Sequence, residues 1–455
     1  MKWSLSVVRL PLTAILCCLL WVPAHAQGDA ERIRLLEQRL NDSLALIESL
    51  RARVDQLERA AGPAAAPAAA VAATPASTTA PDGDQARAIA ALQQDVQQIT
   101  RGLSHRDENS GLKLHGFADV GAAWSSRQDP NRLRGFNVGT VDFYLTPQFG
   151  DRVRSLVELA FEYTQDEGVE VDLERMQIGY TASDALTLWA GRFHTPIGWW
   201  NTAYHHGANL QTSLTRPRFL DFEDRGGVLP VHSVGLWASG KSALGPGRIV
   251  YDAYLTNGPR INGGRLKFNA FNDDNVGKML GGSLAYEPSG ALSGLVVGVH
   301  GFGMGVDVYA NDGTVLRRTK LRMAGGLLAY NERDWEAIGE VYQFSNSDSI
   351  GSSRRSSNLW FAQIGKTIDM LTPFVRYERS SLDPGDYYFA SQREARSYRR
   401  VALGARYALD ARAALKIELS RTAESAMLHF DETGAPVSSS AAGYRRAAIQ
   451  YSIAF

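Results

Sequence analysis

The chain has 455 residues, and its 48 basic and 48 acidic side chains cancel to a formal net charge of zero. A nucleic-acid-binding protein would carry an excess of positive charge or a basic face, so this balance argues against a nucleic-acid partner. The 43 glycines, nine tryptophans and 17 tyrosines favour strands over a helix bundle, and an all-β chain of this length can form one domain.

Residues 1–26 have the layout of a secretory signal peptide. Lys2 and Arg9 lead into an apolar run that ends at Ala24-His25-Ala26, a pattern typical of a cleavage site. The run is shorter than the ~20 residues that a membrane-spanning helix needs, so we expect cleavage rather than anchoring. Both cysteines, Cys17 and Cys18, lie in this segment, and the mature chain is expected to have no disulfide and no cysteine-bound metal.

Three segments are predicted to follow the signal peptide. In residues 27–60, apolar side chains recur every three or four positions from Ile33 to Leu57, which predicts a coiled coil. Residues 61–84 are rich in proline and alanine and predict a linker. A second, shorter apolar seam predicts another coiled-coil helix over 85–105. The alternative is an amphipathic helix on a domain surface, but a seam beside a linker has no domain to cover.

From 111 to 455 the pattern changes to apolar and polar residues in alternation. We count sixteen such segments, beginning with LKLHGFADVGAAW at Leu112. A membrane demands that every backbone group be paired, which a closed barrel provides, and alternation keeps one face apolar and the lumen polar. The sequence therefore predicts an all-β, 16-stranded antiparallel transmembrane β-barrel, preceded by an α-helical coiled coil.

The connections between these segments alternate in length. Even-numbered connections are short turns, such as Gly150-Asp151, whereas several odd-numbered ones are long and polar, as at 346–356, 382–394 and 424–442. Short turns at one end and long loops at the other are typical of an outer-membrane barrel with both termini in the periplasm. A soluble β-sandwich is the alternative, but it would not keep this asymmetry along the chain.

The final strand, GYRRAAIQYSIAF, carries Tyr451, Ile453 and Phe455 on its apolar face. A terminal aromatic residue on such a strand resembles the recognition signal for the barrel-insertion machinery of Gram-negative outer membranes. We therefore expect insertion into outer-membrane lipid.

The longest connection runs from about 194 to 230, between the fifth and sixth strands, and it opens with RFHTPIGWWNTAYHHG from Arg192. Loops of this length in compact domains are usually functional. The candidate site residues are aromatic, histidine and charged residues of this loop: His194, Trp199, Trp200, Tyr204, His205, His206, Arg216, Arg218, Asp221, Glu223, Asp224 and Arg225.

Taken together, the barrel, the terminal aromatic residue and the long third loop resemble a Gram-negative outer-membrane porin. The coiled coil before the barrel resembles the phosphate-selective porin O/P type and the DcaP-like trimeric porins. The resemblance implies a homotrimer and passive diffusion of small hydrophilic solutes, anions among them. It also implies a third loop folded into the barrel, whose candidate residues constrict the pore. The sequence lacks the dense arginine ladder and the lysine cluster of phosphate channels, so phosphate selectivity is not expected.

Alternation also assigns side chains to the lumen wall. The main candidates are Arg154, Glu158, Arg322, Arg376, Arg400, Arg406 and Arg446. Further inward positions are Lys113, Lys320 and Lys416, with the acids Asp119, Asp142, Glu162, Glu336, Glu340, Glu378 and Glu418. Bases gather in the last strands and acids in the first, so the sequence predicts a transverse field, with residues 221–224 facing the basic side.

Other functions were weighed against a porin. The histidines could bind a metal, and His194 or His205 could activate Ser213 in a hydrolase, but no cysteine, HExxH or GxSxG context supports either. We expect no metal, no cofactor and no enzymatic activity, with the histidines holding the loop to the wall. A non-conducting barrel that tethers or spaces the envelope is the remaining alternative.

Overall fold

The computed structural model describes the barrel part of the chain, residues 114–127, 134–164, 168–204, 208–222, 225–267, 277–349 and 353–455. The predicted signal peptide, coiled coils and linker, residues 1–105, lie outside this part, as does Lys113. None of the helices in the described ranges is long and apolar enough to cross a membrane.

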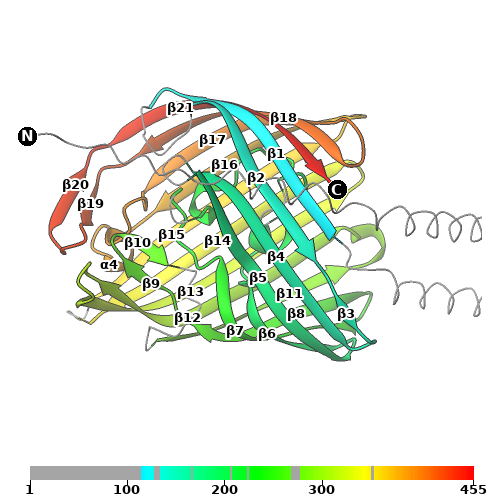
Figure 1. Ribbon diagram of the computed structural model, residues 1–455, viewed down its shortest axis with the longest axis horizontal. Helices are drawn as coiled ribbons and strands as arrows, with labels where there is room; N and C mark the ends of the chain where they lie inside the picture. Colours follow the sequence, from blue (N-terminus) through cyan, green and yellow to red (C-terminus); the bar gives the residue numbers. More distant parts are fainter. Residues whose placement is uncertain are drawn as a thin grey trace, which may run out of the picture. The chain divides into compact units, whose positions relative to one another are not determined.

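Sixteen long antiparallel strands form a closed barrel, as the sequence predicts (Figure 1). Their bounds are β1 (Leu114–Ser125), β2 (Gly135–Leu145), β4 (Val153–Thr164), β5 (Gly168–Ser183), β6 (Leu186–His194), β7 (His232–Leu244), β8 (Gly247–Asn257), β11 (Lys278–Pro288), β12 (Leu295–Tyr309), β13 (Val315–Glu332), β14 (Trp335–Asp348), β15 (Arg354–Lys366), β16 (Leu371–Ser381), β17 (Tyr398–Ala408), β18 (Ala413–Glu424) and β21 (Ala442–Ala454).

Shorter elements lie in the connections: β3 (Gln148–Phe149), β9 (Arg260–Asn262), β10 (Arg265–Lys267), β19 (Met427–Phe430), β20 (Pro436–Ser439), α3 (Trp200–Ala203), α4 (Tyr387–Ala390), η3 (Arg218–Leu220) and η4 (Gly290–Leu292).

The ring closes where the last long strand pairs with the first. β21 runs antiparallel to β1, from Phe117 opposite Ala454 to Ser125 opposite Arg446. The terminal Phe455 extends this ladder, since its backbone N–H donates to the Gly116 carbonyl and its carbonyl accepts from the Gly116 N–H. No edge strand is left in the ring, so each wall strand has a partner on both sides.

Alternation decides which side chains face outward. On β18, Leu415, Ile417 and Leu419 are exposed on the outer face. Lys416 and Glu418 between them are buried inside the barrel. Tyrosines 180, 251, 286 and 407 lie on the outer face near the short turns, where aromatic girdles of membrane barrels occur.

One of the long connections differs from the one expected. The loop predicted over 346–356 has only residues 349–353, because β14 extends to Asp348 and β15 starts at Arg354. The inward Asn346 is buried and donates to Asp386, so these polar residues belong to strands that continue past the apolar band. The loops after β16 and β18 do carry extra structure, the helix α4 and the hairpin β19–β20.

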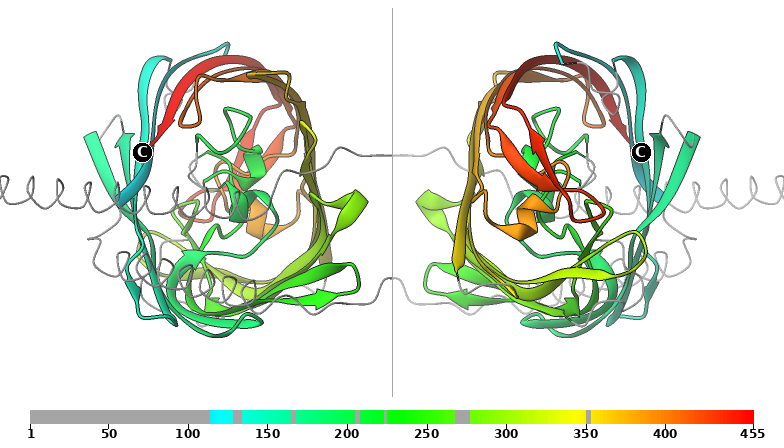
Figure 2. Two further views of the ribbon diagram at one scale, coloured as in Figure 1. Left: turned by 90° about the vertical axis from the view of Figure 1, so that its right-hand side faces the viewer. Right: turned by 90° about the vertical axis from the view of Figure 1, so that its left-hand side faces the viewer.

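Apolar side chains fill one side of the barrel interior. Buried residues of the strands from β8 to β16, such as Phe344 and Phe361, pack with Trp200 and Phe219 of the loop after β6 and Tyr388 of α4. Figure 2, which looks into the barrel, shows these connecting segments inside the ring of strands. The interior is therefore partly a packed core and not a purely polar lumen.

This core corrects two side chains that the sequence assigns to the lumen. Arg322 is exposed on the outer face of β13, and Lys320 lies on the same face, because their neighbours Leu321 and Met323 are the buried, inward ones. Alternation alone places charged residues inward, but on this strand the inward row faces an apolar core.

Candidate functional site

The described residues of the segment 195–231, between β6 and β7, form a loop inside the barrel, which we call the inner loop (Figure 2). Its only regular structure within the described residues is one short turn of α3 and one of η3. With so little hydrogen bonding of its own, the segment needs partners for its backbone groups, and carboxylates of the barrel wall provide them.

The first anchor is Glu340 on β14. Its carboxylate accepts the backbone N–H groups of Trp199 at 3.0 Å and Trp200 at 2.8 Å, and the Tyr342 hydroxyl at 2.6 Å. Gly198 precedes them with φ +66°, and a side chain there would collide with the Glu340 carboxylate. The loop thus bends onto the wall at Pro196-Ile197-Gly198.

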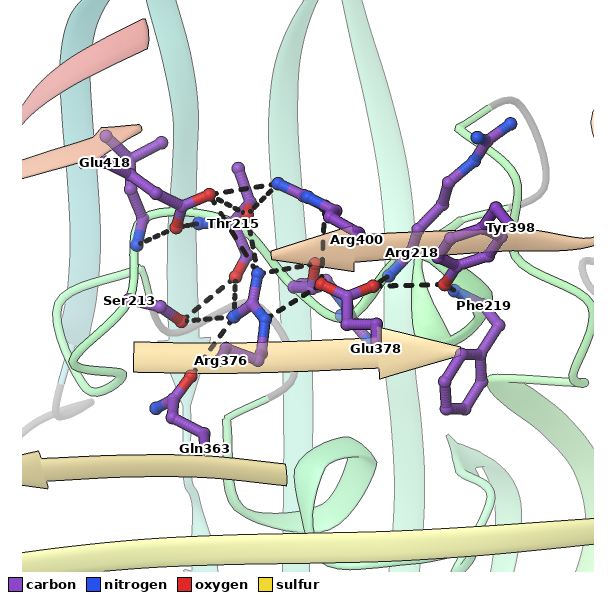
Figure 3. Close-up of polar contacts among 12 residues, drawn as sticks. Ser213, Thr215, Arg218, Phe219, Gln363, Arg376, Glu378, Tyr398, Arg400 and Glu418 are labelled. Atoms are coloured by element: carbon purple, nitrogen blue, oxygen red, sulfur yellow. Dashed lines mark hydrogen bonds and ion pairs between the residues drawn. The ribbon is translucent and has the colours of Figure 1, made fainter. Parts of the chain in front are cut away.

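The second anchor is Glu418 on β18 (Figure 3). Its carboxylate accepts the backbone N–H groups of Leu214 at 3.1 Å and Thr215 at 3.0 Å, and Nη2 of Arg400 at 3.0 Å. Lys416, also buried on β18, donates to the Gln211 carbonyl at 2.6 Å and to the Ala208 carbonyl. Residues 208–215 are therefore bound along β18.

The third anchor is the pair Arg376 and Glu378 on β16, both completely buried. Arg376 donates to Ser213 Oγ, Thr215 Oγ1 and the Thr215 carbonyl at 2.7–2.8 Å, and to Glu378 at 2.9 Å (Figure 3). Glu378 in turn accepts the Arg218 N–H at 2.8 Å. Buried charges persist only when paired and hydrogen-bonded, and here the loop supplies the missing partners.

These contacts change the expected charge layout. The inner loop covers the basic side chains of β16 to β18, and Glu378 and Glu418 neutralise them, so Arg376 and Arg400 do not line an open passage. Beyond η3 the loop turns away from this wall, and Arg225 lies 3.5 Å from Glu162 on β4. Arg225 thus faces the acidic first strands. Glu223 and Asp224, which the sequence predicts to face the basic arc, lie outside the described residues.

Some inward side chains of the first strands, and one loop side chain that faces them, reach solvent. The Glu162 side chain is 24% exposed, Arg225 is 52% exposed and Arg175 on β5 is 21% exposed. Further along β4, Glu158 is completely buried, where it pairs with Arg175 and lies 3.4 Å from Nε2 of His194. The inward row of β4 is buried at Ala160 and Glu158 and exposed again at Arg154.

The predicted loop residues are partly brought together. Trp200 and Tyr204 are in edge-to-face contact, and the Arg376 guanidinium stacks over the Trp200 ring. Arg216 and Arg218 are buried in the loop, where Arg218 pairs with Glu424. His205, His206, Glu223 and Asp224 lie outside the described residues.

Of the predicted wall residues, Arg154 is exposed near the turn between β2 and β4, and Arg406 and Arg446 are half-buried on the inward face. Sequence reasoning placed Glu340, Glu378 and Glu418 inward but missed that they bind the loop backbone. The one feature of the sequence that could have indicated these anchors is the acidic residue at an inward position on each of β14, β16 and β18. Nothing in the sequence indicates the part that Thr215 and Tyr398 play in binding the loop.

Neither alternative chemistry gains support. Ser213 Oγ donates to the Thr215 carbonyl and accepts from Arg376, so it is not positioned as a nucleophile. Within the described residues, no group of three or more histidine, aspartate and glutamate side chains is placed to hold a metal ion.

No family model matches the chain, and no curated protein matches it in sequence. Among solved structures, it is similar to the anion-selective porin from Comamonas acidovorans, with TM-score 0.52, 13% identity, and coverage of 76% of this chain and 99% of that chain. It is also similar to outer-membrane expressed OmpT of Vibrio cholerae, with TM-score 0.50, 10% identity and coverage of 76% and 97%. At these identities the likeness shows the fold alone.

Proposed function

We propose that this protein is an outer-membrane porin through which small hydrophilic solutes, anions among them, diffuse passively. The observation that carries the proposal is the inner loop, which is bound by buried carboxylates to one wall of a closed barrel. Such a loop narrows a lumen without covalent chemistry, and it selects solutes by size and by the charges left exposed.

A location in the outer membrane is supported by the outer face and by the chain end. The outward side chains are largely apolar, with tyrosines near the short turns, as lipid-facing barrel walls require. Phe455 completes the β1–β21 ladder, and its ring meets Phe143 at 5.8 Å between centroids. The predicted signal peptide would export the chain.

The passage runs, in this proposal, along the inward side of β1, β2, β4 and β5. The solvent-accessible charges there include both signs, with Glu162 opposite Arg225 and with Arg175 beside Glu158. Arginines on the passage give anions a favourable contact. The similar Comamonas acidovorans protein is an anion-selective porin, which agrees with this proposal.

A homotrimer is part of the same proposal. The outer face of β1, β2, β4 and β5 stays apolar up to the loop end of the strands, where Phe136, Val138, Tyr163 and Val169 are exposed. Contiguous apolar surface of this kind marks protein–protein contact as well as lipid contact. We place the contact between protomers on this face.

The test is single-channel current of the purified protein in a planar bilayer under a KCl gradient. Current in groups of three steps supports an open trimeric pore, and the reversal potential gives the sign of its selectivity. A folded, inserted protein that passes no current would contradict the porin proposal, and the inner loop would then be a plug.

A further inference from the structure

A row of exposed arginines crosses four adjacent strands on the outer face of the barrel. It consists of Arg379 on β16, Arg399 on β17, Arg421 on β18 and Arg445 on β21, and we call it the arginine row. Their chain neighbours Ser380, Arg400, Ser420 and Tyr444 are buried inside, so the four guanidinium groups project outward. Figure 1 shows the four strands side by side.

The register brings the four arginines into two facing pairs. Arg379 lies directly opposite Arg399, and Arg421 lies directly opposite Arg445. Val401 faces Arg421, so Arg399 is the diagonal neighbour of Arg421. Like charges directly opposite each other destabilise a sheet, and directly opposed side chains are only about 5 Å apart at Cβ.

The described part of the chain supplies no counter-charge for this row. None of the described acidic side chains forms an ion pair with any of the four, and Arg379 has only the Ser381 hydroxyl as a partner, at 3.3 Å. This contrasts with Arg400, one residue along the chain from Arg399, which is paired with Glu378 and Glu418. The opposed charges therefore call for an anion from outside the chain.

The arginine row lies at the boundary between the apolar band of the outer wall and the loop ends of the strands. On the short-turn side of it, the outward residues of β17 and β18 are apolar, for example Val401, Leu403, Leu419 and Ile417. Towards the loop end the apolar band stops. The arginines thus lie where lipid headgroups meet the hydrocarbon region, a place where basic clusters bind anionic lipid.

The same belt continues around the barrel. Arg354 on β15 lies opposite Ser347, which lies opposite Lys320 on β13, and Arg322 is next to Lys320 on the outer face. These are the two cations that alternation misplaces in the lumen. Their outward position adds positive charge at the loop end of the wall.

We propose that the arginine row is a binding site for the phosphate groups of a bis-phosphorylated glycolipid, the lipid A part of lipopolysaccharide. A guanidinium binds phosphate through two parallel hydrogen bonds, which suits a pair of facing arginines. The two pairs are about 10 Å apart, two strand spacings, so they would take two phosphates. The choice of lipopolysaccharide rests on the proposed outer-membrane function, because the loop end then faces the outer leaflet.

The test measures lipid binding to the purified mature protein by native mass spectrometry, with bis-phosphorylated lipid A, mono-phosphorylated lipid A and phosphatidylglycerol as separate probes. The bis-phosphorylated lipid should bind best. The variants Arg379→Gln/Arg399→Gln and Arg421→Gln/Arg445→Gln should each bind it at least tenfold more weakly. A control, Arg152→Gln/Lys366→Gln, removes two exposed cations near the short turns and should bind like the wild type.

Equal binding by the variants, or equal binding of phosphatidylglycerol, would overturn the proposal. A second measurement covers the folding of the variants. Without anionic lipid, each double variant should have a Tm equal to or above that of the wild type, because two opposed charges are removed. A lower Tm would contradict the claim that the arginines repel each other in the lipid-free protein. Channel current should be unchanged in the variants, so a wild type that binds lipid A but does not conduct contradicts only the porin function.

Discussion

Single carboxylates hold the inner loop in place, and Glu418 accepts three hydrogen bonds from it, from the Leu214 and Thr215 amides and the Thr215 hydroxyl. Glu418→Gln should leave Arg400 with a weaker partner and lose charge-assisted bonds to the Leu214 and Thr215 amides, destabilising the loop anchor by about 3 kcal/mol. Single-channel recordings should show a larger or noisier conductance. Asp252→Asn is the control, because Asp252 binds Trp237 and Ser283 of the wall and, among the described residues, no part of the inner loop. Equal effects of both changes would contradict the anchoring role.

A second prediction concerns the backbone conformation of Gly198. Its φ of +66° disfavours any side chain, and a methyl group would also meet the Glu340 carboxylate, so Gly198→Ala should weaken the first anchor by more than about 1 kcal/mol. Gly313→Ala is matched, since its φ is +83° but its surroundings are empty. Thermal unfolding should show a clearly lower Tm for Gly198→Ala, and identical values would argue against the contact.

The sequence predicts the inward residues of β16 and β17 correctly and those of β13 wrongly. Arg376 and Arg400 follow the alternation, whereas Arg322 does not, because Leu321 and Met323 pack inside. Alternation reports which residues share a face, but it leaves open which face is the lumen. The anchoring carboxylates bind backbone N–H groups, which have no sequence signature at all.

At the scale of elements, the exposed tip of the inner loop should control ion selectivity. Arg225 is half-exposed and faces Glu162 at 3.5 Å. Arg225→Glu places two carboxylates together on the proposed passage, so cation permeability relative to anions should rise several-fold. The reversal potential under a KCl gradient measures this. Arg152→Glu, on a turn, should leave the potential unchanged, and an unchanged potential in Arg225→Glu would exclude this passage.

The loop after β16 carries a pH-dependent cap. Asp386 is the N-cap of α4 and accepts from the Tyr388 N–H and from Asn346, and burial raises its pKa from 3.8 to about 6. A raised carboxyl pKa favours the protonated folded state, so this contribution to stability declines as pH rises from about 4 through 6. The segment should be roughly 1 kcal/mol less stable at pH 7.5 than at pH 5.

Hydrogen exchange of residues 382–397, corrected for intrinsic rates, measures that difference. Asp386→Asn keeps a capping oxygen without the charge and should remove most of the pH dependence. Asp383→Asn, a neighbouring partly exposed carboxylate that pairs with Arg355, should keep it. The same pH dependence in all three proteins would contradict the assignment to Asp386.

The length of the loop between β14 and β15 could not be predicted from the sequence pattern. Polar residues such as Asn346 and Ser357 are typical of loops, yet here they are buried strand positions that bind the loop after β16. Because the strands continue past the apolar band, their ends lose the alternation of a lipid-facing wall. The sequence predicts the number of strands and the position of the longest loop correctly, because both are read from the long alternating segments between turns.

For the whole molecule, the outer wall divides into two unlike faces. The loop ends of β1, β2, β4 and β5 expose apolar side chains, whereas those of β16, β17, β18 and β21 expose the arginine row. A wall surrounded only by lipid would have the same side chains all round, since the headgroup region is the same on every side. The difference is expected if one face meets other protomers and the other meets lipid.

Because of this division, an arginine introduced on one face should affect the trimer differently from an arginine introduced elsewhere on the outer wall. Val138→Arg places a charge at an exposed position near the loop end of β2, within the face assigned to the protomer contact, and should convert trimers to monomers. Leu280→Arg places it at a matched exposed position near the loop end of β11 and should leave the trimer intact, since a cation near the interface costs a barrel only about 0–1 kcal/mol. Light scattering of the purified proteins distinguishes the two states. Trimers in both variants, or monomers in both, would place the contact elsewhere on the wall.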